Sequence, residues 1–189
     1  MAPDRATRLT IIAVVGSHDK NLPEEKRQLP YRVGRWIAEN GYHLLTGGGP
    51  GVMEAACEGF CSFEPGGGTP RKGLAIGIIP AGKSPSEYPN RWVELPILTH
   101  LRGADPEGPG SRNHINIRSS AVVVAFTGGS GTLAEVKLAL SRSVPVVACL
   151  RPRETIGGSD SQAIRSLGST VVDSFDGVVA FLEKALRHC

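Results

Sequence analysis

Two glycine-rich segments are the part of this sequence whose residue types and spacing point most directly to chemistry. Residues 47–51 read Gly47-Gly48-Gly49-Pro50-Gly51, with Met53 close behind, and residues 128–132 read Gly128-Gly129-Ser130-Gly131-Thr132. Since glycine has no side chain, the backbone N–H groups of such segments can approach an anion closely. The hydroxyls of Ser130 and Thr132 would add donors. Both segments therefore predict a site for a phosphate-bearing ligand.

Two charged side chains are candidates for a catalytic or binding role beside that phosphate. Glu135 falls early in the helix expected after the second segment, so its carboxylate can reach back over Gly131 and Thr132. It could contact a sugar hydroxyl or stabilise positive charge developing on a ribose ring; the alternative is a solvated helix glutamate. Arg112 opens another helix, where the dipole disfavours a cation unless an anion is bound. The alternative for Arg112 is a surface ion pair with an acid such as Asp105.

Neither glycine segment has the form of the common nucleotide-binding motifs. The chain contains no G-x-x-x-x-G-K-[ST] phosphate loop, and G-x-G-x-x-G is not satisfied. The strand expected after the first segment ends in Ile78-Ile79-Pro80, without an acidic residue for a ribose. These absences disfavour a nicotinamide-dependent dehydrogenase. A mononucleotide or another phosphorylated small molecule fits better.

The elements that must position these residues follow from hydrophobic periodicity. Apolar runs of strand length alternate with stretches of helical period, which predicts an α/β, Rossmann-like open parallel sheet with helices on both faces. We expect one nucleotide-binding domain over residues 1–189, with the glycine segments at the carboxyl ends of strands. The expected strands are 9–15, 42–46, 73–79, 121–126 and 144–150, with shorter ones at 170–172 and within 91–98. The expected helices are 23–40, 50–62, 111–119 (capped by Ser111), 130–142 and 174–187, with a short one near Ser161.

Composition limits the possible partners and location. The 189 residues carry a net charge of +3 without a basic run, so we expect neither nucleic acid nor a membrane as a partner. The sequence shows no transmembrane stretch and no signal peptide, which predicts a cytoplasmic protein. The cysteines at 57, 61, 149 and 189 fit no zinc spacing. Cys57 and Cys61 could share a metal, but a buried Cys57 and a helix-end Cys61 are favoured, so we expect no metal and no cofactor.

The segment from Arg112 to Glu135 resembles the Lonely Guy (LOG) family, whose members were long labelled lysine decarboxylases. That family carries an Arg-Lys pair, a strand, and then P-G-G-x-G-T-x-x-E; here Arg112-Asn113, the strand 121–126 and residues 127–135 have the same spacing. Residues 47–53 resemble its G-G-G-x-x-G-x-M segment, and Gly16-Ser17 and residues 76–80 are also similar. The resemblance covers most of residues 9–150. No lysine stands in an evident pyridoxal-phosphate context, so the decarboxylase label has little support.

The resemblance implies a function as well as a fold. LOG enzymes are usually dimers or larger homo-oligomers that hydrolyse the N-glycosidic bond of nucleoside 5′-monophosphates, releasing a free base and ribose 5-phosphate. Arg112 and Glu135 would then be catalytic. Gly16, Ser17, Met53 and the two glycine segments would bind the ligand and its phosphate.

Three departures keep other functions open. Asn113 replaces the lysine, Thr127 the proline and Glu54 a glycine of the family pattern. An Arg-Asn pair looks equally similar to a sister branch that includes molybdenum-cofactor carriers, which bind a phosphorylated pterin without catalysis. The alternatives to a phosphoribohydrolase are therefore a non-catalytic carrier of a phosphorylated cofactor and a nucleotide sensor.

Overall fold

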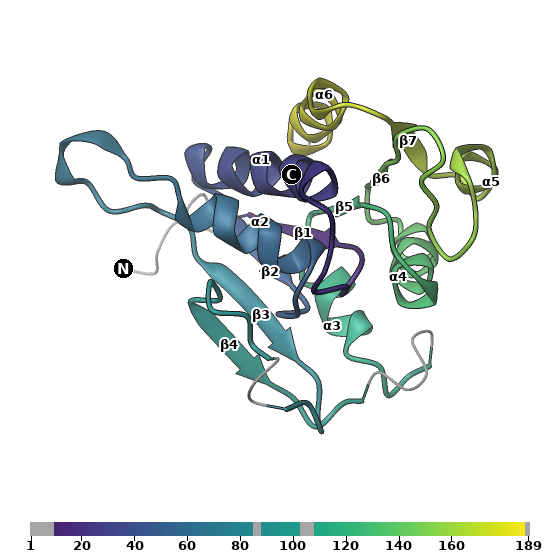
Figure 1. The fold of residues 1–189 in the computed structure, drawn as a ribbon, viewed down its shortest axis with the longest axis horizontal. Coiled ribbons are helices and arrows are strands. Elements are labelled where there is room, and N and C mark those ends of the chain that lie inside the picture. Colours follow the sequence, from purple (N-terminus) through teal and green to yellow (C-terminus); the bar gives the residue numbers. More distant parts are fainter. Residues whose placement is uncertain (1–9, 85–87, 103–107, 188–189) are drawn as a thin grey trace, which may run out of the picture.

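The computed structural model describes residues 10–84, 88–102 and 108–187 and contains one seven-stranded sheet. Every pair of neighbouring strands is parallel (Figure 1). The strands are β1 (Ile11–Val15), β2 (His43–Thr46), β3 (Ala75–Ile79), β4 (Leu95–Leu98), β5 (Val122–Ala125), β6 (Val146–Cys149) and β7 (Thr170–Val172). The predicted α/β, Rossmann-like class is confirmed, including the short strands within 91–98 and at 170–172.

Helices cover both faces of this sheet (Figure 1). They are α1 (Glu24–Glu39), α2 (Val52–Cys61), α3 (Asn113–Arg118), α4 (Ser130–Ser141), α5 (Ser161–Ser166) and α6 (Phe175–Leu186), with a short 3-10 turn, η2, at Gly66–Gly68. Alternate residues of β1 enter two different apolar clusters. Ile12 and Val14 pack with α1, α2 and α6, whereas Ala13 and Val15 pack with α3, α4 and α5. A continuously apolar strand is therefore what a two-sided core requires.

The strand order creates a crevice at the centre of the sheet. The order is β4-β3-β2-β1-β5-β6-β7, so the chain runs outward from β1 to β4 and then crosses to the other side of β1. The loops after β1 and β5 consequently leave in opposite directions, and ligands of open α/β sheets bind at such a point. Gly16 and Gly128 lie in these two loops. At the far edge, the residues of β4 are exposed.

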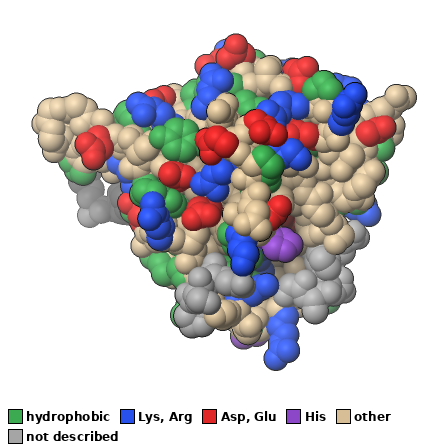
Figure 2. Space-filling view, in the orientation of Figure 1, with side chains coloured by type: hydrophobic (Ala, Val, Ile, Leu, Met, Phe, Trp, Pro, Cys, Tyr) green, Lys and Arg blue, Asp and Glu red, His purple; other side chains and the backbone are tan. Residues whose placement is uncertain are grey.

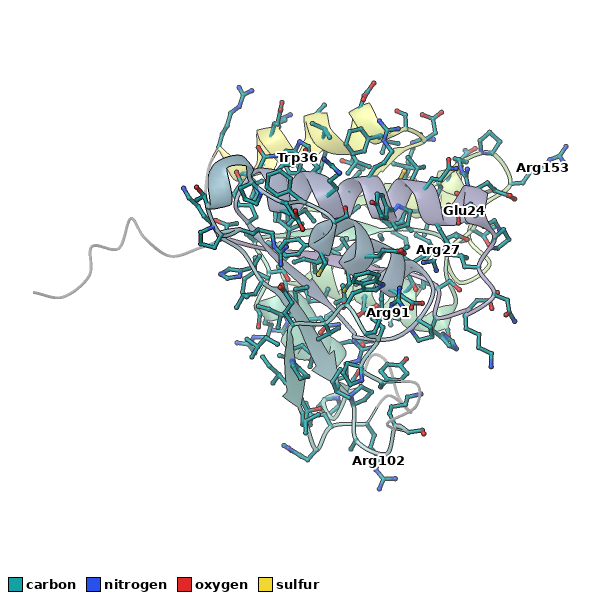
Figure 3. The ribbon with its side chains drawn as sticks, turned by 60° about the vertical axis from the view of Figure 1, so that its left-hand side comes forward. Glu24, Arg27, Trp36, Arg91, Arg102 and Arg153 are labelled. Atoms are coloured by element: carbon teal, nitrogen blue, oxygen red, sulfur yellow. The ribbon has the colours of Figure 1, made fainter. Side chains whose placement is uncertain are left out.

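Glycines allow α1 and α2 to approach one another closely. A Cβ at Gly34 would overlap the carbonyl oxygen of Ala56, and one at Gly59 would overlap that of Tyr31. Arg27, which projects between the two helices in Figure 3, adds an ion pair with Glu58, Nη2 to Oε2 2.8 Å. Since α2 begins directly after the first glycine segment, this packing fixes where that segment lies.

Two features refine the sequence expectations. The N-cap of α3 is Arg112 rather than Ser111, although the Ser111 hydroxyl oxygen still accepts a hydrogen bond from the Asn113 N–H at 3.2 Å. Arg112 already has helical dihedral angles, so Ser111 still acts as the side-chain cap predicted for it, one residue before the assigned N-cap. Within the described ranges, none of the helices is both long enough and apolar enough to cross a membrane.

Candidate functional site

A cleft of about 300 Å³ lies at the carboxyl ends of β1 and β5. Five parts of the chain contribute to it: the loop after β1, the start of α2, the segment between β3 and α3, the start of α3 and the first turns of α4. The lining residues are Gly16, His18, Met53, Pro80, Lys83, Tyr88, Arg112, Asn113, Gly129, Ser130, Gly131, Thr132 and Glu135. The fold thus brings most of the predicted site residues to one place.

The second glycine segment forms the open, amide-rich wall of the cleft. Gly129 is the N-cap of α4, and no side chain caps this end of the helix. The first-turn N–H groups therefore lack a side-chain acceptor and carry the positive end of the helix dipole. A Cβ at Gly129 or Gly131 would meet nothing within 4 Å, so space for a ligand lies directly against this backbone. Gly128 instead packs over the Thr132 hydroxyl.

The first glycine segment is buried behind the cleft wall. A Cβ at Gly47 would overlap the Arg112 guanidinium, and a Cβ at Gly49 would lie 2.5 Å from Tyr88 Oη and 2.8 Å from Met53 Cε. Gly48 has a φ of +71° and packs against Ile79. These glycines therefore make room for Arg112, Tyr88 and Met53, which line the cleft. Direct phosphate contact by residues 47–51 stays a prediction.

The loop after β1 makes backbone hydrogen bonds to residues next to both glycine segments. The Ser17 N–H donates to the carbonyl of Thr127 at 2.9 Å, and the Ser17 carbonyl accepts from the Val52 N–H at 2.9 Å. Gly51, at φ +72°, lies close beneath this loop: a Cβ there would come within 2.5 Å of the Ser17 carbonyl oxygen. Gly16 lies against Val52 and lines the cleft. The start of α2 and the end of β5 are therefore held in register through Ser17.

Arg112 and Glu135 form a buried, loosely paired couple in the cleft. Arg112 Nη1 lies 4.0 Å from Glu135 Oε1, and the two side chains are 13% and 9% exposed. Asn116 donates from Nδ2 to the same Glu135 oxygen at 3.0 Å. The solvated alternative for Glu135 is therefore wrong, while Asp105, the proposed partner of Arg112, lies outside the described residues.

The hydrogen bonding of this couple is incomplete. Arg112 Nη1 and Asn116 Oδ1 are both buried without a hydrogen-bond partner. Burial raises the pKa of the Glu135 carboxyl, and the charge of Arg112 and the Asn116 hydrogen bond oppose that rise. Buried polar groups that lack partners are costly and uncommon, and this unpaired donor belongs to a side chain that lines the cleft.

The cleft opens into a larger groove of about 860 Å³ along the loops after β1 and β3. His18, Lys83 and Tyr88 line both spaces. The remaining lining residues are Ser17, Asp19, Lys20, Asn21, Pro50, Glu54, Pro89, Asn90 and Arg91. Arg91 lies below α2 in Figure 3, with its guanidinium carbon 4.6 Å from the centre of the Trp92 ring. Arg112, Glu135 and residues 129–132 line the smaller cleft, and the groove is its extension.

The sequence analysis assigned no site role to several lining residues, although Pro80 and Asn113 lie in segments that resemble the LOG family; these residues are His18, Pro80, Lys83, Tyr88 and Asn113. Pro80 and Lys83 follow β3, so a carboxyl-end position was the available signal for them. No sequence signal pointed to Tyr88, because it reaches the cleft from an irregular proline-rich segment. The Asn90 N–H donates to the Gly48 carbonyl at 2.7 Å and its Nδ2 to the Gly49 carbonyl at 2.9 Å. These bonds fasten that segment to the first glycine segment.

The three departures from the LOG pattern have local structural accounts. Thr127 donates its hydroxyl to the Thr155 carbonyl at 3.0 Å, a bond that proline could not make. Asn113 is buried and lines the cleft where a lysine would bring a charge. Glu54 lies 3.9 Å from Arg27 and borders the groove.

Charged groups elsewhere are mixed and show no metal cluster. Acidic and basic side chains intermingle over the face drawn in Figure 2. Within residues 10–84, 88–102 and 108–187, no three His, Cys, Asp or Glu side chains gather in a way that could hold a metal ion. Cys57 is fully buried and Cys61 ends α2, as favoured from the sequence, and burial raises the pKa of Cys57 to about 12.

The seven-stranded parallel sheet, with helices on both faces and a switch point between β1 and β5, defines the Rossmann-like α/β class. Within that class the chain belongs to the SLOG cluster4 family, whose model matches residues 9–173. The LOG-like superfamily expected from the sequence is thereby confirmed.

Similar proteins come from several kinds of organism. The molybdenum cofactor binding protein of Rippkaea orientalis is 30% identical, with a TM-score of 0.73 over 95% of this chain and 99% of that one. The Moco carrier protein of Chlamydomonas reinhardtii is 31% identical, with a TM-score of 0.73 over 96% of this chain and 100% of that one. An uncharacterized protein of Archaeoglobus fulgidus is 34% identical over 151 residues, which are 80% of this chain and 86% of that protein.

Proposed function

We propose that this protein binds a phosphorylated small molecule, with the phosphate against the N-terminus of α4. The observation that carries the proposal is the pairing of two incomplete groups across one cleft. The first turn of α4 has no side-chain cap and open space at Gly129 and Gly131, and Arg112 Nη1 is buried without an acceptor. Phosphate oxygens would accept hydrogen bonds from both.

The cargo that best fits is the phosphorylated pterin of the molybdenum cofactor, bound as ligand and not as a resident catalyst. Two similar proteins are named for binding or carrying this cofactor, and both match nearly the whole of this chain. The groove beyond Lys83 and Tyr88 supplies space for the non-phosphate part. Uncharged Asn113 in place of a lysine also agrees with the carrier branch of the resemblance.

The second candidate is a nucleoside 5′-monophosphate phosphoribohydrolase, and the observation that favours it is the position of Glu135. A carboxyl that lines the cleft near Arg112 is placed to steer water or stabilise an oxocarbenium-like ribose while Arg112 orients the substrate. Burial raises the pKa of the Glu135 carboxyl, whereas the charge-stabilising role requires its ionised form. A nucleotide sensor would use the same cleft without turnover.

One experiment separates these functions. Purified protein is denatured and its supernatant examined for pterin absorbance and fluorescence, while native protein is incubated with AMP and assayed for free adenine. The carrier function predicts released pterin and no adenine. Adenine release that disappears in Glu135→Ala would establish the hydrolase, and AMP binding by calorimetry without turnover would establish the sensor. No binding of pterin, AMP or phosphate by folded protein would refute the proposal.

Two further expectations remain proposals. We propose a cytoplasmic protein and a homo-oligomer, for which multi-angle light scattering gives the mass. Edge strand β4 is the surface to vary, because Leu95, Ile97 and Leu98 are exposed there, Leu98 by 78%. Leu98→Lys should lower the oligomer mass if this edge is the interface, and an unchanged mass would place the interface elsewhere.

A further inference from the structure

A carboxylate in the same cleft as an anion site is an electrostatic conflict that the structure must resolve. Glu135 lines the cleft together with Ser130, Gly131 and Thr132, whose backbone faces the proposed phosphate. A carboxylate and a phosphate in one cleft repel each other strongly where little water screens their charges. Glu135 is only 6% exposed, so screening by solvent is weak there.

The cation paired with Glu135 in the described part of the chain is Arg112, which is also the cation that a ligand would use. Arg112 stands 4.0 Å from Glu135 Oε1, too far for a hydrogen bond, and its buried Nη1 has no acceptor. A bound anion that takes this donor would share the positive charge of Arg112. Arg112 would then balance the charge of Glu135 less fully, and the anion would add a negative charge beside it.

Asn116, which contacts Glu135, has an acceptor atom suited to a protonated carboxyl. Asn116 is fully buried, donates from Nδ2 to Glu135 and leaves Oδ1 without a partner. A protonated Glu135 carries an O–H donor, which can serve this amide oxygen after rotation of the amide or can serve the bound anion. The ionised form leaves the Asn116 acceptor unsatisfied.

We propose that anion binding in this cleft is coupled to the uptake of one proton by Glu135. This inference rests on the proposed function, because it requires an anion at the N-terminus of α4. The proton passes from solvent to a carboxylate oxygen of Glu135, and no other bond is made or broken. Burial already raises the pKa of the Glu135 carboxyl, and a bound anion would raise it further.

Other titratable groups face the same space and must be separated from Glu135. They are Arg112 at the start of α3, His18 after β1, and Lys83 and Tyr88 from the segment between β3 and β4. Comparison of wild type with Glu135→Gln isolates the carboxyl, because the amide keeps the acceptor for Asn116 but cannot titrate.

The test is calorimetric titration with sodium sulfate, an anion that carries no proton near neutral pH. Titrations at one pH in two buffers of different ionisation enthalpy give the protons taken up per sulfate bound. Wild type should take up a clear fraction of one proton, and its Kd should rise with pH, by at most about tenfold per unit for one linked proton. Glu135→Gln should bind sulfate with little uptake and a nearly constant Kd.

The matched control is Glu183→Gln, which removes an exposed carboxyl on α6 far from the motif residues and should behave as wild type. Equal heats in both buffers for wild type would overturn the inference without needing any variant, while leaving the anion site intact. Uptake that persists in Glu135→Gln would assign the proton to another group such as His18 and would also overturn it. Absence of sulfate binding to wild type would refute the anion site itself, and the inference with it.

Discussion

Replacing Gly47 by alanine tests whether the first glycine segment acts by making room for Arg112. A Cβ at Gly47 would overlap both terminal nitrogens of the Arg112 guanidinium and lie 2.6 Å from its Cζ. Its three nearest neighbours are all atoms of this one flexible side chain, so the guanidinium must leave its position. The backbone itself tolerates alanine, because the φ of Gly47 is outside the left-handed region.

The magnitude follows from the contact that is lost. A hydrogen bond to a charged group contributes about 1.5–3 kcal/mol, and about 1.4 kcal/mol corresponds to tenfold in Kd. If Arg112 no longer reaches the phosphate, affinity for phosphate or AMP should fall roughly 10- to 100-fold. The lower conformational entropy of the unfolded alanine variant contributes about 0.4–1 kcal/mol of stability, which offsets part of the cost of moving the guanidinium.

The assay is calorimetric titration of Gly47→Ala beside a melting curve. Gly66→Ala is the matched control, because Gly66 is exposed in η2, has open space at its Cβ and lies outside both cleft and groove. The control should keep wild-type affinity. A folded Gly47→Ala protein that binds as tightly as wild type would show that Arg112 does not hold the ligand from its present position.

Three other substitutions test separate parts of the structure. Gly131→Val places a side chain in open cleft space, so it should abolish phosphate binding while α4 still forms; unchanged affinity would remove the anion site from this wall. Glu135→Gln should gain stability relative to wild type as pH rises above 4.5, because the raised pKa means that the unfolded state ionises first. Urea denaturation at several pH values measures this difference in the free energy of unfolding. A difference that stays constant with pH would contradict a raised pKa of the Glu135 carboxyl. Gly34→Ala should destabilise the protein by about 1–3 kcal/mol, because the added methyl overlaps the backbone carbonyl of Ala56, which cannot rotate away. Chemical denaturation checks this, and an unchanged midpoint would mean that α1 and α2 separate easily.

The agreement between sequence and structure is greatest where a local pattern has one physical solution. A run such as 121–126, apolar at every position, has to be covered on both faces, and β5 is buried in the middle of the sheet. Gly128 and Gly129 directly before a helical pattern predicted an accessible helix N-terminus, and α4 begins at Ser130 without a side-chain cap. Helical geometry predicted that Glu135 could reach back over this segment, and the structure places it in the cleft lining.

The role of Gly47 could not be predicted in the same way. Its sequence neighbours suggest a backbone donor, yet its neighbour in space is Arg112, which is 65 residues further along the chain. Tyr88 and Lys83 reach the cleft from a proline-rich segment without periodicity, so no local pattern described their direction. The burial of Glu135 likewise depends on the packing of α3 against α4, which brings Asn116 to its carboxylate.

By itself, the sequence determined the α/β class, the succession of strands and helices, and the presence of two glycine segments at strand ends. Those properties depend on residue spacing along the chain and on what backbone geometry each residue allows. Only the tertiary structure decided the strand order, and therefore which strand ends meet at the crevice. It also decided that one glycine segment faces the cleft while the other supports Arg112, because that difference depends on which distant side chain fills the space above each glycine.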